Sequence, residues 1–232
     1  MIVNSIDVCE NFHAIILNRE IQASDVVTYD EWLDCSILPI RVKKDKHQYA
    51  SVSVKILLEE DTDEEVLLSI SELLRLATRC RLEFSDLEWG YDAVLVTHST
   101  KQIMKGKAEL TMNFQAPVKY GPENEVIVQE TSDVVTYEGT TESPCILSIL
   151  PASVLSSLTI TGLSEKPIII NHLEAGKEIV IDGELGKVTC EGANKFGDYD
   201  AWEFPRLLPG DNTVTMDSDI CQVTITYKPL YL

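Results

Sequence analysis

The sequence has few aromatic residues, little positive charge and no long apolar run. Aromatic residues make up 7% of its 232 residues, against 44% hydrophobic and 25% charged. These proportions are those of a globular protein and exclude disordered, collagen-like and coiled-coil classes. Nineteen Lys and Arg against 38 Asp and Glu give a net charge of −19, which repels phosphates and argues against sequence-specific nucleic-acid binding. No apolar run reaches the roughly 18 residues of a membrane span, so no membrane insertion is expected.

Motifs that hold metals, cofactors or catalytic groups are also missing. There is no C-x-x-C, G-x-S-x-G, H-E-x-x-H, P-loop or G-x-G-x-x-G, and the four histidines are scattered. The N-terminus has no basic segment followed by an apolar stretch, so no secretory signal is expected and the cysteines are expected to be reduced. The prediction is no enzyme, no cofactor and no metal site. A hydrolase remains as a third hypothesis and needs His and Asp/Glu clustered in a cleft. The six cysteines are Cys9, Cys35, Cys80, Cys145, Cys190 and Cys221.

Two acidic triplets resemble fragments of calcium loops. They are Asp198-Tyr199-Asp200 and Asp217-Ser218-Asp219, and hard cations prefer clustered carboxylates. Neither continues into the Gly and later Glu of an EF-hand, so we interpret both as solvated acidic loops.

Composition changes near residue 120 and divides the chain into two predicted domains, 1–121 and 122–232. The first 120 residues contain two of the eleven glycines and two of the nine prolines. Residues 1–122 carry a net charge of −7 and residues 123–232 a net charge of −12. The segment 115–124 holds two prolines and a glycine, which is typical of a connector.

The first half predicts a β-domain with one helix near residues 62–79. Thr62 and Glu65 form a capping box, and apolar residues follow at 66, 67, 70, 73, 74 and 77 with helical periodicity. Residues 49–56, 93–97 and 107–114 alternate as strands do.

The second half predicts an all-β sandwich. Short β-rich runs recur about every ten residues, separated by turn residues, with no helical pattern. Asp182-Gly183 predicts a hairpin turn, and Leu208-Pro209-Gly210-Asp211 predicts a type II turn with a positive φ at Gly210. The hexapeptide at 24–29, Ser-Asp-Val-Val-Thr-Tyr, recurs identically at 132–137 and is interpreted as two similar strands in two β-domains.

Aromatic residues near 200 offer a possible sugar site. Tyr199 and Trp202 lie on or beside a predicted loop and could stack on a pyranose ring. The alternative is that Trp202 and Phe204 fill the end of the sandwich core.

Motifs of the second half resemble the phage distal tail protein (Dit) family. The family pattern N/E-G-T-x-x-x-P-x-I-x-I is similar to residues 139–149, which begin with Gly139-Thr140-Thr141 and continue through Pro144 and Ile146 to Ile149. The family pattern G-x-x-I-x-I-D resembles Gly176 to Asp182, and the pattern F-P-x-L-x-P-G-x-N-x-I/V resembles Phe204 to Val214. Residues 223–232 resemble the closing strand and aromatic tail of the family. The resemblance runs in order along the whole chain and is most specific over 139–232.

The resemblance implies a structural protein that forms a hexameric ring at the tip of a long non-contractile tail. The first domain is then a tail-tube-like β-sandwich or half-barrel, and the second a galectin-like β-sandwich. The ring joins the tail tube protein to the tail-associated lysin or fibre protein and anchors receptor-binding proteins. DNA only passes through its lumen, whose acidic walls would repel phosphates over ~8 Å at physiological salt. The expected location is the virion tail tip, after assembly in the host cytoplasm. A carbohydrate-binding module that recognises a cell-surface glycan remains as the alternative.

The densest positive cluster lies in the first domain, where family members often have a loop with Gly and Arg. Here Arg41, Lys43, Lys44 and Lys46 follow one another without a glycine. Two interpretations stay open: a solvated loop, or a loop that contacts a neighbouring subunit or partner.

Overall fold

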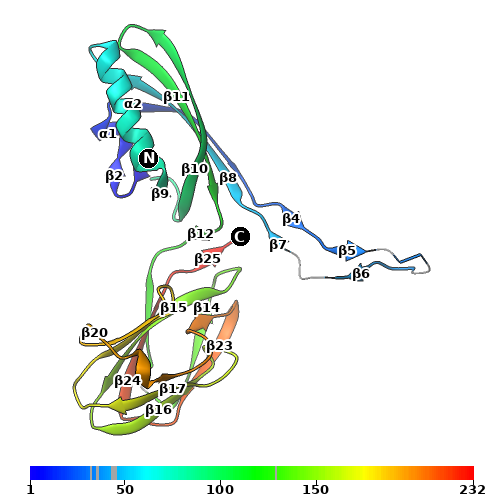
Figure 1. The fold of residues 1–232 in the computed structure, drawn as a ribbon, viewed down its shortest axis with the longest axis vertical. Helices are drawn as coiled ribbons and strands as arrows, with labels where there is room; N and C mark the ends of the chain where they lie inside the picture. The colour runs from blue at the N-terminus through cyan, green and yellow to red at the C-terminus, as the bar shows by residue number, and fades with distance from the viewer. Residues whose placement is uncertain (32, 35–36, 43–45, 129) are drawn as a thin grey trace. The chain divides into compact units, whose positions relative to one another are not determined.

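The chain forms two compact units in a computed structural model, Met1–Tyr120 with Leu232, and Gly121–Tyr231. The structure describes residues 1–31, 33–34, 37–42, 46–128 and 130–232. Both units are built mainly from antiparallel strands (Figure 1), so the predicted mainly-β fold class is confirmed. Among the described residues, no helix is long and apolar enough to cross a membrane.

The first unit is one antiparallel sheet with the strand order β2-β1-β9-β10-β11-β8-β3, and β12 adds to β10. Burial alternates along β8 and β11, whose inward residues form the core. The predicted strands at 49–56, 93–97 and 107–114 are therefore confirmed. The strands are β1 (Ile2–Val3), β2 (Ile6–Asp7), β3 (Ala14–Gln22), β8 (Ala50–Glu59), β9 (Arg79–Glu83), β10 (Gly90–Met104), β11 (Lys107–Ala116) and β12 (Lys119–Tyr120).

The long helix α2 (Asp63–Ala77) packs on the core side of this sheet, against β8, β9 and β11. The predicted capping box is present: the Glu65 carboxylate accepts the Thr62 N–H at 3.0 Å, and Thr62 Oγ1 accepts the Glu65 N–H at 3.2 Å. The helix ends at Ala77 rather than near 79, because Arg79 already pairs within β9. Leu67, which the periodicity placed on the apolar face, is exposed.

A second helix, α1 (Val8–Asn11), is one turn long and lacks the length for a periodic signal, so the sequence predicted only one helix. Its N-cap is Asp7, whose Oδ1 accepts the N–H groups of Cys9 and Glu10 at 2.7 and 3.3 Å.

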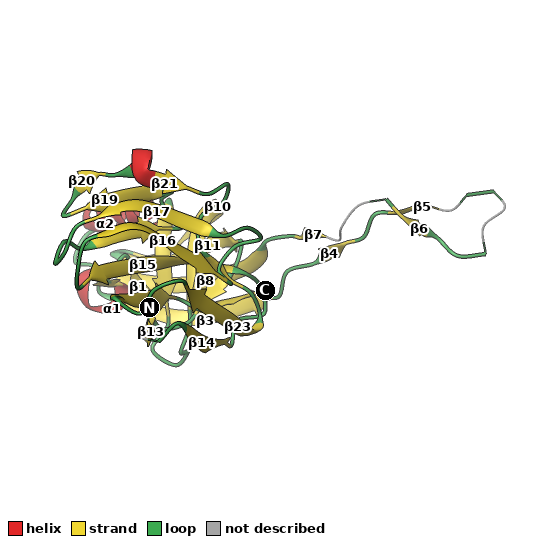
Figure 2. Cartoon of the chain, turned by 90° about the horizontal axis from the view of Figure 1, so that it is seen from below, coloured by secondary structure: helices red, strands yellow, loops and turns green. Residues whose placement is uncertain are grey.

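Between β3 and β8, the described residues of 23–49 form a two-stranded ribbon that leaves the sheet, and we call this segment the arm (Figures 1 and 2). Its outgoing and returning legs pair antiparallel, β4 with β7 and β5 with β6. The paired strands are β4 (Val26–Val27), β5 (Asp30–Glu31), β6 (Ile40–Arg41) and β7 (Lys46–His47).

The second unit is a β-sandwich, as predicted. One sheet has the order β13-β24-β15-β18-β19-β20 with β22 beside β15, and the other has the order β14-β23-β16-β17-β21. Inward residues of both sheets form one core. The first sheet contains β13 (Asn124–Val128), β15 (Ser143–Pro151), β18 (Ile179–Asp182), β19 (Lys187–Cys190), β20 (Ala193–Asn194), β22 (Arg206–Leu207) and β24 (Cys221–Tyr227). The second contains β14 (Ser132–Tyr137), β16 (Leu155–Thr161), β17 (Ile168–Leu173), β21 (Tyr199–Asp200) and β23 (Gly210–Met216); the 3-10 turn η1 (Phe196–Asp198) precedes β21, and β25 (Leu230–Tyr231) follows β24.

Both predicted turns of this unit are located. Asp182 ends β18, and its Oδ1 accepts the N–H groups of Glu184 and Leu185 in the hairpin to β19. Gly210 has a φ of +93°, as the Pro-Gly sequence predicts.

The five cysteines within the described residues are free thiols. Burial raises the pKa of Cys145 to about 12 and that of Cys80 to about 11, so these thiols are poor nucleophiles near neutral pH. Cys35 lies outside the described residues.

Candidate functional site

The arm exposes a row of apolar side chains and has no hydrophobic core of its own to cover them. Ile37 is 92% exposed and Leu38 72% exposed, and Leu33, Ile40 and Val42 are also exposed. An isolated two-stranded ribbon is marginally stable in water, and a contiguous exposed apolar surface usually marks a contact with another molecule. The arm is therefore a candidate contact surface.

The two legs of the arm carry opposite charge. The outgoing leg has Asp25, Asp30, Glu31 and Asp34, while the predicted basic residues occupy the returning leg. Arg41 is exposed on β6, in register with Asp30 on β5, and Lys46 lies in β7 in register with Val27. Lys43 and Lys44 lie outside the described residues.

The sheet of the first unit ends at β3, an apolar edge strand. Among the described strands its only neighbour is β8. Ile15, Ile16, Leu17 and Ile21 are exposed along it. Unpaired N–H and C=O groups on such an edge are a template for strand pairing with another chain.

A second edge lies along the distal part of β10. The pairing of β10 with β9 ends at Val94, whereas its pairing with β11 continues to Met104. From Val96 to Met104 the described strands therefore leave one side of β10 without a neighbour, and Val96, Ile103 and Met104 are exposed there. This edge and the β3 edge are different surfaces of the same sheet.

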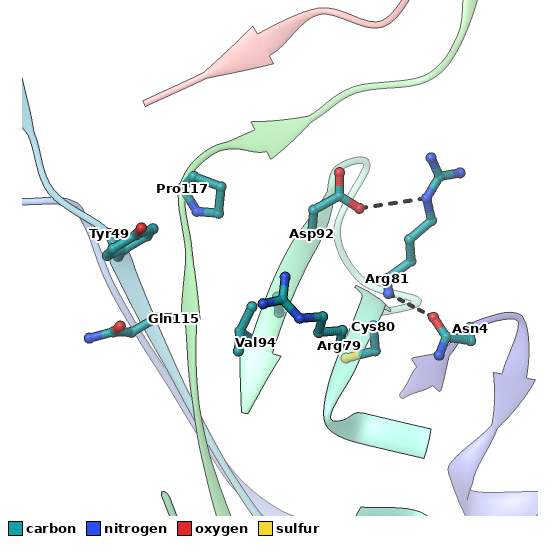
Figure 3. Close-up of a pocket in the computed structure, with 10 residues that line it drawn as sticks. Asn4, Tyr49, Arg79, Cys80, Arg81, Asp92, Val94, Gln115 and Pro117 are labelled. Atoms are coloured by element: carbon teal, nitrogen blue, oxygen red, sulfur yellow. Dashed lines mark hydrogen bonds and ion pairs between the residues drawn. The ribbon is translucent and has the colours of Figure 1, made fainter. Parts of the chain in front are cut away.

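A cavity of about 670 Å³ opens beside the base of the arm, lined by Tyr49 of the arm, by residues of β9, β10 and β11, by Pro117 and by the turn after β1 (Figure 3). Arg81 is held on two sides: its Nε lies 3.6 Å from Asp92 Oδ1, and its N–H donates to Asn4 Oδ1 at 2.9 Å. The guanidinium of Arg79 extends into the cavity and has no ion-pair or hydrogen-bond partner within the described part of the chain.

A second cavity of about 480 Å³ continues the first one toward the arm. The two share Tyr49, Gln115 and Pro117, and the second adds Tyr29 and His47 of the arm among its lining residues. We call the joined cavities the arm-base groove. Sequence reasoning missed this groove because six separate segments of the chain build it, and no local pattern marks any of them.

The structure separates the two aromatic residues considered for sugar stacking. Tyr199 stacks on Phe204, with ring centroids 5.3 Å apart and planes at 14°, and its hydroxyl donates to the Glu203 carbonyl. Burial raises the pKa of Tyr199 to about 12. Trp202 is 85% exposed, with Lys166 Nζ 5.1 Å from its ring centroid. Phe204 packs against the core, but Trp202 does not fill it, so that interpretation of Trp202 is wrong.

The acidic triplets do not assemble a cation site. No group of three His, Cys, Asp or Glu side chains suited to a metal occurs in the described ranges. Asp198 instead accepts from Lys195 Nζ at 2.8 Å and lies 2.8 Å from His172 Nδ1, and these contacts, the Lys195 hydrogen bond first, hold its pKa below the usual range. The His172 side chain is largely exposed, so this pair does not form the cleft that a hydrolase needs.

Comparisons with known proteins agree with the fold and the second-half motifs. Residues 138–231 match the family model described as siphovirus-type tail component, C-terminal domain. The solved structure of the SPP1 Dit protein (gp 19.1), described as a paradigm of the hub adsorption apparatus in phages that infect Gram-positive hosts, matches with a TM-score of 0.80 at 14% identity, over 100% of this chain and 98% of that chain.

Two structures of the phage P2 baseplate in its activated conformation, with Ca and with Sr, match at a TM-score of 0.57. Their identities are 9% and 10%, over 95% of this chain and 92% of theirs. Comparison with curated proteins gives no match. The second unit thus matches the siphovirus-type tail component family, a family of structural tail proteins, over residues 138–231, and the whole chain has the fold of a solved Dit protein.

Proposed function

We propose that this tail protein assembles into a closed hexameric ring at the tail tip, as a hub between the tail tube protein and the tail-associated lysin or fibre protein. Receptor-binding proteins are anchored on the same ring, and assembly takes place in the host cytoplasm. The solved relatives support a hub, since one is described as part of a hub adsorption apparatus and another belongs to a baseplate. The observation that carries the proposal is the pair of unpaired strand edges on one sheet, each with exposed apolar side chains.

The two edges favour a ring because they are different surfaces. Contact between the β3 edge of one copy and the distal β10 edge of the next is heterologous, and such contacts close into rings when the rotation per copy allows it. Strand pairing satisfies the free backbone groups of both edges, and the apolar side chains beside them leave water. Each copy then extends the sheet of its neighbour around the ring. The number six comes from the family resemblance.

The sheet face opposite α2 suits the wall of a passage. Two of its lysines are paired across neighbouring strands: Lys55 Nζ lies 3.1 Å from Glu109 Oε2, and Lys107 Nζ lies 2.7 Å from Glu59 Oε1. These two amines are each neutralised by a neighbouring carboxylate, which weakens the attraction of this part of the face for a phosphate. We propose that this face lines the lumen and that DNA passes it without being held.

The proposal is tested with variants that place a charge on each edge. Ile15→Lys on β3 and Ile103→Lys on β10 put an ammonium beside the unpaired strand and should shift the protein to monomers, because the contact would bury an unpaired charge. Val154→Lys, at an exposed apolar site of the second unit, is the matched control. Light scattering after gel filtration gives the mass, and circular dichroism checks the fold. Edge variants that assemble like the natural protein would refute this ring contact.

A second candidate, glycan binding by the second unit, rests on the exposure of Trp202. An indole that is 85% exposed has a free face for a pyranose ring. Titration of the protein with glycans, followed by NMR, should then shift the indole signal of Trp202 saturably, and Trp202→Ala should abolish binding. Tyr199 is not part of this site, since its ring is already stacked.

A further inference from the structure

We propose that the tip of the arm of one copy docks in the arm-base groove of the next copy, where its carboxylates meet Arg79. The inference rests on the proposed ring and names the contact that the arm makes within it. The occupant is a second copy of this chain.

Arg79 supplies the arm-base groove with a positive charge that can bind a carboxylate. Of the two arginines that line the cavity, Arg81 is paired with Asp92, and its guanidinium carbon lies 5.6 Å from the centroid of the Tyr120 ring. Arg79 neighbours it on the same strand without a side-chain partner in the described part of the chain, and Figure 3 shows it directed into the cavity. In a chain with twice as many acidic as basic residues, an unpaired guanidinium in a cavity is suited to a carboxylate.

The rest of the groove is suited to apolar side chains. Tyr49 and Val94 are exposed, and Pro117 lies between the two cavities. Aromatic and proline surface beside an arginine is the composition of a recognition site for an apolar and acidic segment.

The tip of the arm has the complementary composition. Glu31 and Asp34 supply carboxylates on the outgoing leg, and Ile37 and Leu38 supply the two most exposed aliphatic side chains of the arm. Docking would place the carboxylates at Arg79 and cover Ile37 and Leu38 with the aromatic part of the groove. It would remove the largest exposed apolar surface of the arm from water.

The length of the arm matches the spacing between neighbours. A leg from residue 23 to residue 37 reaches at most roughly 50 Å at ~3.3 Å per residue. A domain the size of the first unit has a radius of gyration of ~14 Å and hence a width of roughly 35 Å. Equivalent points on adjacent copies of a ring are about one domain width apart, so a tip can reach the next arm base.

The tip of the arm does not dock in the arm-base groove of its own copy. The arm starts and ends beside its own groove, and its legs stay paired from β4 and β7 to β5 and β6. The tip is therefore carried away from its own base, and Ile37 remains 92% exposed within one copy.

Disulfide trapping tests the contact directly. In the Ile37→Cys/Val94→Cys variant, mild oxidation should link copies into a ladder that ends at the ring on non-reducing gels. Each single variant controls for the natural cysteines, and Ile37→Cys/Val154→Cys places the second thiol in the second unit. No ladder from a protein that does assemble would overturn the docking while leaving the ring proposal intact.

Charge exchange is the independent test. Arg79→Glu and Asp34→Arg should each raise the dissociation constant of assembly at least ~10-fold, and the double variant should recover most of that loss. Lys187→Glu, an exposed site in the second unit, makes the same change in net charge as Arg79→Glu and should leave assembly close to that of the natural protein. Losses that the double variant does not recover would contradict the pairing. A natural protein that stays monomeric overturns the docking and the autonomous ring together.

Discussion

Arg19 and Asp86 form a two-point ion pair, with Nη1 2.7 Å from Oδ1 and Nη2 2.6 Å from Oδ2. The same guanidinium lies 4.5 Å from the centroid of the Phe84 ring. Arg19 belongs to β3, at one end of the sheet order, whereas Asp86 and Phe84 follow β9, which lies toward the other end. The pair thus bridges distant strands and indicates that the sheet curls, as a half-barrel does.

This pair predicts a specific acid sensitivity of the first unit. Hydrogen bonding to Arg19 lowers the pKa of Asp86. The ion pair therefore stabilises the fold at pH values above the usual pKa of an aspartate, and this stabilisation is lost as pH falls through the lowered pKa. Asp86→Asn should lower the melting temperature at neutral pH, and the difference from the natural protein should shrink as the pH falls. Melting curves from pH 7 down to acid measure this. A difference that is independent of pH would mean that the pair contributes nothing through charge.

A second prediction concerns Gly139, which makes room for Tyr137. The Tyr137 hydroxyl donates to the Thr141 carbonyl at 2.9 Å and accepts the Leu230 N–H at 2.8 Å, and a Cβ on Gly139 would lie 2.1 Å from that hydroxyl. Gly139→Ala should therefore destabilise the second unit by about 1–3 kcal/mol through overpacking. Hydrogen exchange of β14 amides measures the effect in this unit.

The matched control for Gly139 is Gly197→Ala, because nothing lies within 4 Å of a Cβ built there. Equal protection of β14 in both variants would show that the Tyr137 ring moves away without cost.

A third prediction concerns Gly210, whose φ of +93° strains a β-branched residue. Asn212 fixes this turn, since its Nδ2 donates to the carbonyls of Leu208 and Gly210 at 2.8 and 3.0 Å. Gly210→Val should cost about 1–3 kcal/mol, measured as a lower denaturation midpoint of the second unit. Gly197→Val is the control, and equal midpoints for the two variants would mean that the turn adapts.

A fourth prediction concerns the basic returning leg of the arm. If Arg41, Lys43, Lys44 and Lys46 face acid on a neighbour, replacing all four by Ser should weaken assembly, and assembly of the natural protein should weaken as salt rises. Light scattering across a salt series on both proteins measures this. An unchanged mass for the Ser variant at every salt concentration would instead support a solvated leg.

The repeated hexapeptide shows what a local pattern can and cannot predict. Residues 24–29 and 132–137 are identical, and both contain strand. In the second unit Val135 and Tyr137 are buried, whereas the equivalent Val27 and Tyr29 lie in the arm without a core around them. Alternation predicts an extended backbone, but which sheet receives it depends on residues far away in the sequence.

The candidate site was less predictable than the fold. The α2 capping box, the strands of the sandwich and the turn at Gly210 each depend on residues within a few positions, so the sequence predicts them. The free edge of β10 depends on where its pairing with β9 stops, and the free edge of β3 depends on the strand order of the sheet. The arm-base groove depends on Arg79, Tyr49 and Gln115 meeting in space. The sequence shows the basic leg as a charge cluster, but it does not predict that this leg is half of a protruding ribbon.

The mass and shape of the purified natural protein test the central claim most directly. Native mass spectrometry and negative-stain microscopy at high micromolar concentration should show closed rings of about 155 kDa, six times the 25.9 kDa of one chain. A single species of 25.9 kDa at that concentration, with no ring in the images, would contradict autonomous assembly through the free edges and the arm.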